Sequence, residues 1–308
     1  GKEIFYGREE QFTTISLWVW KSLAKSDFVE NAIGFSIDGK GYVGIGHYKN
    51  EAYTPAFMKY DPAYNAWTQI ADPHYYAEGA VGLSLGDKGY MGTGSFNGIQ
   101  KTFWEYNPAT NKWTQKSNIT GPERVEAVSF SIGSKGYVGT GRSSTSTALN
   151  DFWQYNPSSD SWTQLANFPG EARSGSVGFS IGTKGYVGTG QYGNTWYKDF
   201  YEYNPQTNTW TRAADFGGAA RSDAIGFSVG TRGYIGTGQN GILQFKDFWE
   251  YDQQMNSWTQ KTDFEGGERY GAIGFSIGNK GYIGNGKNGF SYNYNSKIYD
   301  DLWEIIVK

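Results

Sequence analysis

The chain has 308 residues, of which 44 are glycine, 18% are aromatic, 19% are charged and none is cysteine. Its 27 lysine and arginine residues against 30 aspartate and glutamate residues give a net charge of -3, so no basic surplus favours nucleic acid or an anionic membrane. The absence of cysteine excludes disulfides, thiolate catalysis and cysteine-ligated metal centres, and no apolar run approaches the ~20 residues of a membrane-spanning helix.

The N-terminal segment carries no recognisable targeting signal. Gly1 opens the sequence without an initiator methionine, and the basic, apolar and small-residue pattern of a signal peptide is not present. We therefore expect a trimmed or mature chain, with any targeting segment outside this sequence.

One block of sequence recurs six times along the chain. GFSIDGKGYVGIG at 34–46 returns in similar form at 82–94, 129–141, 178–190, 226–238 and 274–286. The aligned residues Phe35, Leu83, Phe130, Phe179, Phe227 and Phe275 are separated by 48, 47, 49, 48 and 48 residues. A second block of the type FWEYNPATNKWTQ follows each of the first five. Repeats of this length indicate a closed, radially repeated architecture.

Each unit is predicted to form four short strands, named a to d. In strand a of the first unit, Ile33, Phe35 and Ile37 alternate with small residues, and a glycine-containing turn at 38–41 leads into strand b at 42–46. The Phe-Trp-Glu-Tyr run is strand c, an Asn-Pro segment is typical of the next turn, and strand d begins at the following Trp. We expect the small face of strand a at the narrow inner edge of the sheet and its Phe/Ile face in the gap to the next blade.

The predicted fold class is all-β, with 1–308 forming a single six-bladed β-propeller of four-stranded blades. The blades are expected at about 29–71, 77–118, 124–167, 173–215, 221–264 and 269–308. Because the sixth unit ends after strand c, the segment 15–23 is expected to supply its strand d, with Trp18 or Trp20 in the place of the repeated Trp. This pairing would remove an exposed sheet edge and close the ring.

The glycines, the tyrosine, the Asp/Asn-Pro turn and the Trp resemble kelch repeats in order and period, over about 16–308. The glycines are spaced Gly-x-Gly, as in Gly188 and Gly190, rather than adjacent, which indicates a bacterial variant similar to the propellers of galactose oxidase and of sialate mutarotase relatives. The resemblance implies an extracytoplasmic location, at the cell surface or in the periplasm. It does not imply the copper–radical centre of galactose oxidase relatives, which needs a cysteine. The fold hosts unrelated activities, so function must be argued from the site.

Two patterns in the sequence are typical of cofactor or metal sites, and each lacks a feature that such a site needs. Three segments match G-x-G-x-x-G, at 188–193, 236–241 and 284–289, but a dinucleotide site needs a helix directly after the glycines. A loop and a further strand are expected instead, and the glycines are better explained as space for a neighbouring aromatic ring. His47 and His74 fall in loops of one face without a clear third ligand. We expect no metal and no cofactor.

Four arginines stand six residues before the strand-a phenylalanine. They are Arg124, Arg173, Arg221 and Arg269. In kelch proteins such arginines line the mouth and can bind acidic ligands, which makes them candidate ligand-binding residues. However, Asp151, Asp199, Asp247 and Asp301 precede strand c in the same four units, whereas units 1 and 2 lack both partners and have Val29 with Ala56 and Ala77 with Thr102. This covariation favours an Arg–Asp pair that ties two loops of one blade together, and both interpretations stay open.

The b–c loops are the most varied segments, and they emerge on the same face as the d–a loops. Variable loops on a rigid scaffold usually carry recognition, and aromatic rings among amides and hydroxyls can stack on sugars or hold a peptide. Together with the four arginines, the candidate ligand-binding residues are His47, Tyr48, Tyr53, His74, Tyr192, Trp196, Phe245 and Tyr292. The alternative is a set of solvated loops with packed aromatics.

Carboxylates at the entrances to strand a are weak candidates for acid–base catalysis. They are Glu30, Glu78, Glu126 and Asp223. Glu126 with Arg124, and Asp223 with Arg221, loosely fit the arginine and carboxylate that an enzyme resembling a sialate mutarotase would need.

The sequence favours a non-catalytic, monomeric binding propeller that engages a glycan or a protein through its loop-rich face. Binding to nucleic acid and membrane insertion are not expected. A sugar-converting enzyme resembling a sialate mutarotase and a structural surface module are the alternatives. Since most of the composition is explained by the repeat, function is expected in the residues that break it.

Overall fold

Every regular element in the described part of the chain is a β-strand. The structure is a computed structural model that describes residues 18–26, 28–48, 56–289 and 297–306. Within these ranges no helix is long and apolar enough to cross a membrane.

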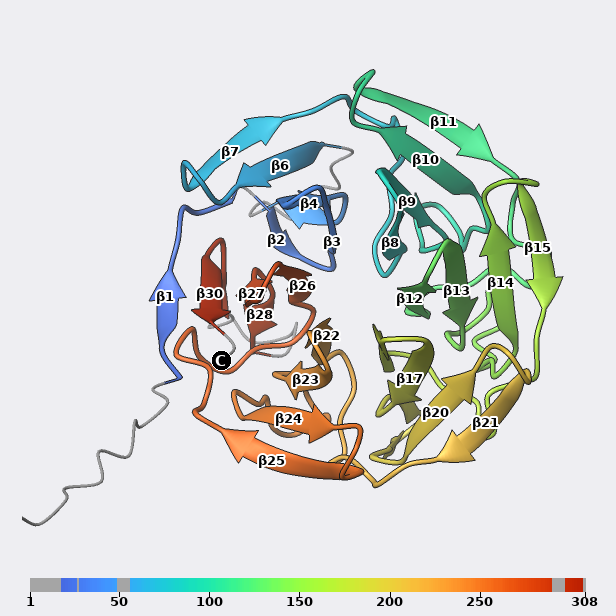
Figure 1. Cartoon of the computed structure of the whole chain (residues 1–308), viewed down its shortest axis with the longest axis vertical. Helices are drawn as coiled ribbons and strands as arrows, with labels where there is room; N and C mark the ends of the chain where they lie inside the picture. Colours follow the sequence, from blue (N-terminus) through green and yellow to red (C-terminus); the bar gives the residue numbers. More distant parts are fainter. Residues whose placement is uncertain (1–17, 27, 49–55, 290–296, 307–308) are drawn as a thin grey trace, which may run out of the picture.

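Six four-stranded antiparallel sheets follow one another around a central axis (Figure 1). From the axis outward, blade 1 is β3(Ile33–Ile37), β4(Lys40–Gly44), β6(Phe57–Asp61) and β7(Ala66–Gln69); blade 2 is β8(Val81–Leu85), β9(Lys88–Gly92), β10(Phe103–Asn107) and β11(Lys112–Lys116); blade 3 is β12(Val128–Ile132), β13(Lys135–Gly139), β14(Phe152–Asn156) and β15(Ser161–Gln164). Blade 4 is β16(Val177–Ile181), β17(Lys184–Gly188), β20(Phe200–Asn204) and β21(Thr209–Arg212); blade 5 is β22(Ile225–Val229), β23(Arg232–Gly236), β24(Phe248–Asp252) and β25(Ser257–Lys261); blade 6 is β26(Ile273–Ile277), β27(Lys280–Gly284), β30(Leu302–Ile306) and β1(Trp20–Ser22). The predicted fold class, a six-bladed β-propeller, is confirmed.

Packing between blades follows from the alternation in strand a. Ile33, Phe35 and Ile37 are buried while the residues between them are only partly so. Phe35 reaches the next blade, where a Cβ at Gly89 would lie 2.3 Å from its ring. The aromatic face of each strand a thus fills the gap to the following blade, as predicted, and a glycine at the start of strand b receives it. Strand b begins at Lys40 rather than at residue 42, so the turn is two residues tighter than expected.

The two positions of the Gly-x-Gly motif require glycine for different reasons. A Cβ at Gly188 would lie 2.5 Å from the Phe200 ring, so this glycine makes room for an aromatic side chain as predicted. Gly190 instead has a φ of 93°, a left-handed conformation that favours glycine. No helix follows; the chain enters the hairpin of β18(Gln191–Tyr192) and β19(Thr195–Trp196), so the geometry of a dinucleotide site is not formed there.

A polar clamp joins each of the first five blades to the one before it. In blade 4, Asn208 Oδ1 accepts from the backbone N–H of Ala166 at 2.9 Å and from the Tyr203 hydroxyl at 2.9 Å. The Trp210 indole nitrogen donates to the Ala166 carbonyl at 3.0 Å. Asn65, Asn111, Asp160 and Asn256 make the equivalent bonds in the other blades. The clamp explains why Asn or Asp precedes the repeated Trp by two residues.

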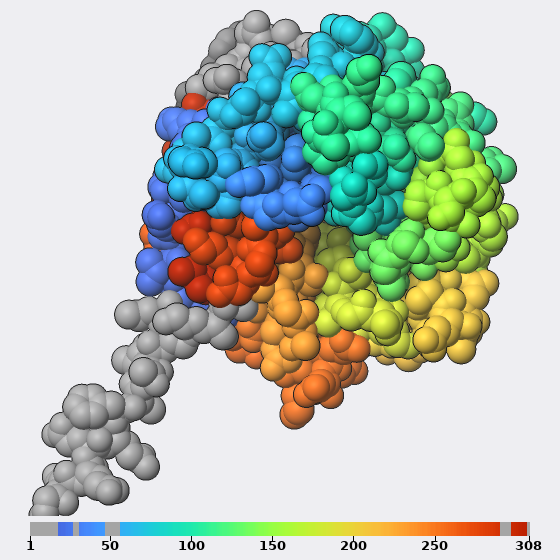
Figure 2. Space-filling view, turned by 45° about the horizontal axis from the view of Figure 1, so that its top comes forward, coloured from blue at the N-terminus to red at the C-terminus, as the bar shows by residue number. Residues whose placement is uncertain are grey.

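The ring is closed by the N-terminal strand, as predicted. β1 pairs with β30 so that Trp20 faces Ile305, the register in which Trp67 faces Tyr60 in blade 1. Trp20 therefore takes the place of the repeated Trp and packs edge-on against Phe248 and Phe264 in blade 5. Figure 2 shows the sequence running once around the molecule, with a recess where the blades meet.

Candidate functional site

The b–c and d–a connections lie together on one face, called here the loop-rich face, and three short two-stranded sheets extend it in the described part of the chain. They are β2(Phe28–Glu30) with β5(His47–Tyr48), β18 with β19, and β28(Lys287–Asn288) with β29(Lys297–Ile298). At the centre of this face the axis opens into a cavity of about 160 Å³ lined by residues of all six blades. We call this cavity the channel mouth.

One residue from each blade forms a ring around the channel mouth. In blade order the six are Asn31, Gly79, Glu126, Gly175, Asp223 and Gly271, and all have a positive φ. Main-chain hydrogen bonds join five of the six neighbouring pairs: for example, the Gly175 N–H donates to Glu126 O at 3.0 Å, and the Asp223 N–H to Gly175 O at 3.0 Å. The ring thereby fixes the position of any side chain that it carries.

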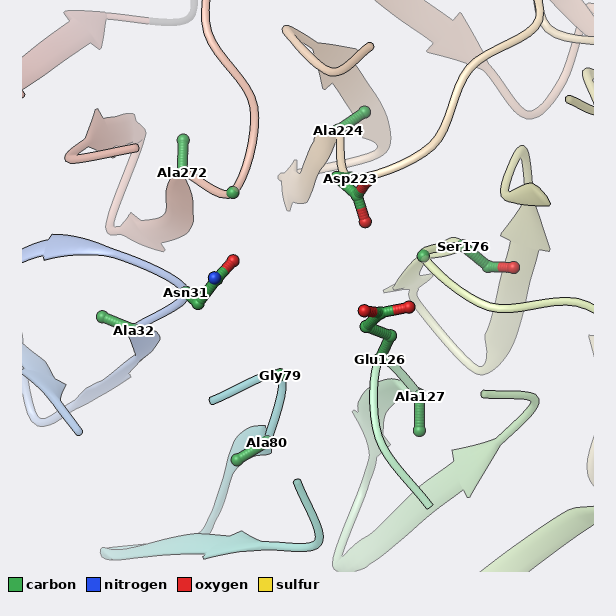
Figure 3. Close-up of a pocket in the computed structure, with 12 residues that line it drawn as sticks. Asn31, Ala32, Gly79, Ala80, Glu126, Ala127, Ser176, Asp223, Ala224 and Ala272 are labelled. Atoms are coloured by element: carbon green, nitrogen blue, oxygen red, sulfur yellow. The ribbon is translucent and has the colours of Figure 1, made fainter. Parts of the chain in front are cut away.

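Polar residues and glycine alternate around this ring because each polar side chain covers the glycine before it. A Cβ at Gly175 would lie 2.6 Å from Asp223 Oδ1, and one at Gly271 would lie 2.8 Å from Asn31 Oδ1. The ring thus places three polar side chains, from blades 1, 3 and 5, at the channel mouth, whose lining also includes Ser176 of blade 4. Glu126 and Asp223 point toward each other, with Asn31 directed into the same space from the opposite side (Figure 3).

Each of the two carboxylates accepts a side-chain hydrogen bond, Glu126 from the next blade and Asp223 from its own blade. Ser174 of blade 4 donates to Glu126 Oε2 at 2.8 Å, and Gln239 of blade 5 donates to Asp223 Oδ2 at 3.0 Å. Burial, together with the charge of Glu126, raises the pKa of Asp223 to about 6, despite opposing hydrogen bonds from Gln239 and Ser222 and the charge of Lys287. Like charges held close with little water favour the protonated form of one of them.

A second cavity, called here the groove, adjoins the channel mouth between blades 3 and 4. It has a volume of about 330 Å³ and is lined by Glu126, Arg142, Ser146, Ala148, Ser174, Gln191, Tyr192 and Gly193. Arg142 donates to Glu126 at 3.2 and 3.4 Å while 41% of its side chain stays exposed. Tyr192 is 54% exposed. Glu126 lines both cavities, so one ligand could occupy the groove and reach the axis.

The four Arg–Asp pairs are formed as the covariation suggested. Arg124 bonds Asp151 at 3.0 and 2.6 Å, and Arg221 bonds Asp247 at 2.5 and 2.8 Å. Arg173 with Asp199 and Arg269 with Asp301 are equivalent. All four arginine side chains are 0% exposed, so they offer a ligand no surface. We therefore do not include them in the candidate ligand-binding site.

Blade 2 replaces its missing arginine with a tyrosine. Each arginine also donates to the carbonyl inside the Gly-x-Gly motif, for example Arg124 to Thr140 O at 3.1 Å. In blade 2, where Ala77 stands in place of arginine, the Tyr75 hydroxyl donates to the equivalent Thr93 O at 2.5 Å. Burial raises the pKa of Tyr75 to about 12, so the hydroxyl keeps its proton. The arginine position is therefore part of the scaffold in this blade too.

The other predicted site residues are scattered. Tyr192 lines the groove, and Trp196 lies in the same hairpin. Phe245 packs on the Arg221 guanidinium at 4.0 Å. His74 has an 89% exposed side chain beside Asp72 and lines neither cavity.

Several predictions cannot be placed. Tyr53 and Tyr292 lie outside the described residues, as do the side chains of His47, Tyr48 and Glu30. Glu78 precedes Gly79 of the ring, and its main chain pairs with Ser95. Among the side chains that can be described, no three acidic or histidine residues are grouped to hold a metal ion.

Sequence reasoning identified Glu126, Asp223 and Tyr192 but missed Asn31, Arg142, Ser174 and Gln191. A signal for the last three was present. The residue directly after Gly-x-Gly varies among the units, with five residue types in six positions: His47, Ser95, Arg142, Gln191, Gln239 and Lys287. In each blade it pairs with the residue just before the ring position, as Ser174 does with Gln191. Variable positions beside a fixed motif mark the face on which the blades differ.

The architecture and its loop-rich face define the chain as a six-bladed β-propeller. Residues 116–286 match the family described as the KLHDC2/KLHL20/DRC7 Kelch-repeats domain. The match spans more than half of the chain, and the protein belongs to the kelch-repeat family. Kelch propellers are in general binding modules, and this chain has the corresponding fold.

Comparison with solved structures supports the fold alone. The structure of YjhT has a TM-score of 0.76 with this chain at 15% sequence identity, covering 91% of this chain and 96% of that one. It is among 794 solved chains that match, and likeness shared so widely says little about function. No curated protein matches.

Proposed function

We propose that this propeller binds a glycan on its loop-rich face, in the groove between blades 3 and 4 and the adjoining channel mouth. The observation that carries the proposal is the convergence of Glu126, Arg142, Ser174, Gln191 and the exposed ring of Tyr192 on one cavity of about 330 Å³. That volume is near the lower end of the ~300–1,000 Å³ typical of small-molecule sites. It suits one end of a saccharide chain.

The chemistry of the groove matches that of a sugar. Sugar hydroxyls donate to carboxylate and amide oxygens and accept from guanidinium and amide N–H groups. Glu126 supplies the first kind of partner, Arg142 the second, and Gln191 both. The half-exposed Tyr192 ring offers an apolar face on which a sugar ring can stack. A glycan partner also accords with an extracytoplasmic location, which stays a prediction.

Binding to a glycan array, followed by calorimetry on the strongest ligand, tests this proposal. Tyr192→Ala and Arg142→Ala are each expected to weaken binding by at least about tenfold, equivalent to about 1.4 kcal/mol. Tyr64→Ala is the matched control, because Tyr64 is 81% exposed in the c–d turn of blade 1 on the opposite face. Equal affinities for the wild type and both groove variants would overturn the proposal, as would a protein ligand that binds through the groove when no glycan does.

A second candidate is a sugar-converting enzyme resembling a sialate mutarotase, favoured by the facing carboxyls of Glu126 and Asp223. With its raised pKa, Asp223 can give a proton near neutral pH, and the carboxyl group of Glu126 faces it, so the pair offers two groups for acid–base catalysis. Interconversion of the anomers of free sialic acid, followed by NMR, should then be faster than in buffer and slow again in Asp223→Asn. Unchanged interconversion with the wild type rejects this candidate.

A further inference from the structure

Three polar side chains reach the channel mouth from alternate blades of the ring. Asn31, Glu126 and Asp223 stand at equivalent positions of blades 1, 3 and 5 and share a left-handed backbone, with φ of 52°, 55° and 54°. Alternate blades of a six-bladed ring are related by a threefold rotation about its axis (Figure 1). Figure 3 shows the three side chains directed into one space. The mouth therefore carries an approximately threefold set of oxygen-bearing groups, which the sixfold repeat by itself would not produce.

Two of these side chains have polar atoms without a partner in the protein. Asp223 Oδ2 accepts from the Ser222 hydroxyl and from Gln239, both at 3.0 Å. Within the described residues nothing donates to Asp223 Oδ1, and the Asn31 amide forms no hydrogen bond either. Polar atoms with little access to solvent are normally paired. Because both side chains line the cavity, their free oxygens indicate a ligand that donates hydrogen bonds.

The negative charge of the mouth is not balanced at Asp223. Glu126 has an ion-pair partner in Arg142, at 3.2 Å, whereas Asp223 forms no ion pair in the part of the chain that the structure describes. Burial and the charge of Glu126 raise the pKa of Asp223 to about 6, despite its two hydrogen bonds and the charge of Lys287. A cation between the two carboxylates would relieve their repulsion, whereas the carboxylate of an acidic sugar would add to it.

The number and placement of the acceptors fit a primary ammonium group better than other cations. An ammonium group has three N–H donors, one for each of Asn31, Glu126 and Asp223. Calcium and magnesium ions need about six or more oxygen ligands, and among the side chains that can be described no three acidic or histidine residues are grouped for a metal ion. A guanidinium is a planar fork that matches one carboxylate rather than three separate acceptors.

We propose that the channel mouth binds the protonated amine of an amino sugar, so that the propeller selects glycans with a free amino group over N-acetylated, neutral and acidic ones. This inference rests on the proposed function, because the adjoining groove would hold the rest of the saccharide. Glu126 lines both cavities and would contact both parts of the ligand. N-acetylation of the sugar would remove the charge and two of the three N–H donors, and would leave Asp223 without a cation.

A glycan array that carries each amino sugar in its free-amine and its N-acetylated form tests this selectivity. The strongest ligand is expected to have a free amine and, in calorimetry at about pH 7, to bind at least about tenfold more tightly than its N-acetylated form. At that pH Asp223 is largely ionised, and an amine beside oxygen substituents is still largely protonated. If no glycan binds, the proposed function itself fails. If glycans bind without preference for the free amine, only the present inference is overturned.

Variants of the ring then show whether the channel mouth is the origin of the preference. Asp223→Asn and Asn31→Gly, the latter compatible with a positive φ, should each weaken binding of the free-amine ligand by at least about tenfold. Asp263→Asn removes a charge from a half-exposed carboxylate on the outer rim and should bind like the wild type. A preference that Asp223→Asn leaves unchanged overturns the proposal. So does a lysine peptide that binds more tightly than the free-amine glycan, or binding of calcium chloride, titrated alone, that Asp223→Asn abolishes.

Discussion

At the scale of single residues, the candidate site depends on the positions at which the ring around the channel mouth departs from its sixfold repeat. The ring around the channel mouth needs a positive φ in every blade, which glycine adopts most readily. Asn31, Glu126 and Asp223 depart from glycine in alternate blades, and each covers the glycine before it. The non-glycine residues of the ring therefore place two carboxyl groups face to face, an arrangement that the propeller fold itself does not require.

Replacing Asp223 with asparagine should change the pH dependence of stability. The pKa of Asp223 in the folded protein, about 6, lies above the ordinary value of 3.8 for an aspartate. Its protonated form therefore favours folding at low pH, and that stability is lost as pH rises through about 6. Above pH 7, Asp223→Asn should be more stable than the wild type by about 3 kcal/mol in urea unfolding, and the difference should be nearly lost near pH 4.

The half-exposed Asp263 on the outer rim supplies the control for this measurement. Asp263→Asn should shift stability little at any pH, because exposed ion pairs such as that with Lys246 contribute little. A difference between Asp223→Asn and the wild type that stayed constant from pH 4 to pH 8 would contradict the account of the carboxyl pair.

At the scale of structural elements, the buried Arg–Asp pairs tie the loop before strand a to the start of strand c. Arg221 donates to Asp247, to Thr237 O at 2.8 Å and to Ala219 O at 3.0 Å, and packs on Phe216 and Phe245. Removal of one partner leaves the other charge buried without compensation. Arg221→Ala and Asp247→Ala should each lower the free energy of unfolding by about 3–5 kcal/mol.

A double-mutant cycle measures this coupling directly. The double variant Arg221→Ala with Asp247→Ala should be about as stable as either single variant. Arg212 and Asp215, an exposed pair at 2.8 Å, provide the matched control, for which each alanine variant should cost less than about 1 kcal/mol. Full additivity for Arg221 and Asp247 would show that the two residues act independently.

The strands, the turns and the Arg–Asp pairs could be predicted from the sequence because, in a sixfold repeat, each position can be compared with its equivalents in five other units. The residues of the candidate site were harder to predict from the sequence for the same reason. Glu126 and Asp223 stood out as departures from the repeat, but nothing in the spacing states that side chains from blades 3 and 5 meet across Gly175. Arg142 and Gln191 each directly follow a Gly-x-Gly motif, and the motif was interpreted only through its glycines. Tyr75 shows a further limit, because a residue two places away took over the bond of the missing arginine.

At the scale of the whole molecule, the joint between blades 5 and 6 differs from the other five. Trp18 stands two residues before Trp20, where the other blades have Asn or Asp, and Ile305 stands where they have tyrosine. The polar clamp is replaced by ring contacts, such as that of Trp18 with Tyr234. In the described residues the Trp20 indole nitrogen has no hydrogen-bond partner, so closure depends on apolar burial.

Ring closure should therefore fail when this burial is lost. Deletion of 18–22 removes the outer strand of blade 6 and is expected to lower the melting temperature by at least about 10 °C, since Trp→Ala in a core alone costs about 3–5 kcal/mol. Trp20→Ala should reproduce much of the loss, while Val19→Ala should not, because Trp20 is 3% and Val19 56% exposed. A melting temperature unchanged by the deletion would refute closure by β1.

The central claim is that the loop-rich face holds a glycan in the groove between blades 3 and 4. Crystals soaked with the strongest ligand from the glycan array test it most directly. The account predicts difference density for a sugar within hydrogen-bond distance of Glu126 and Arg142 and in contact with the Tyr192 ring. Density on the opposite face or along the outer strands, with the groove free of sugar, would contradict it.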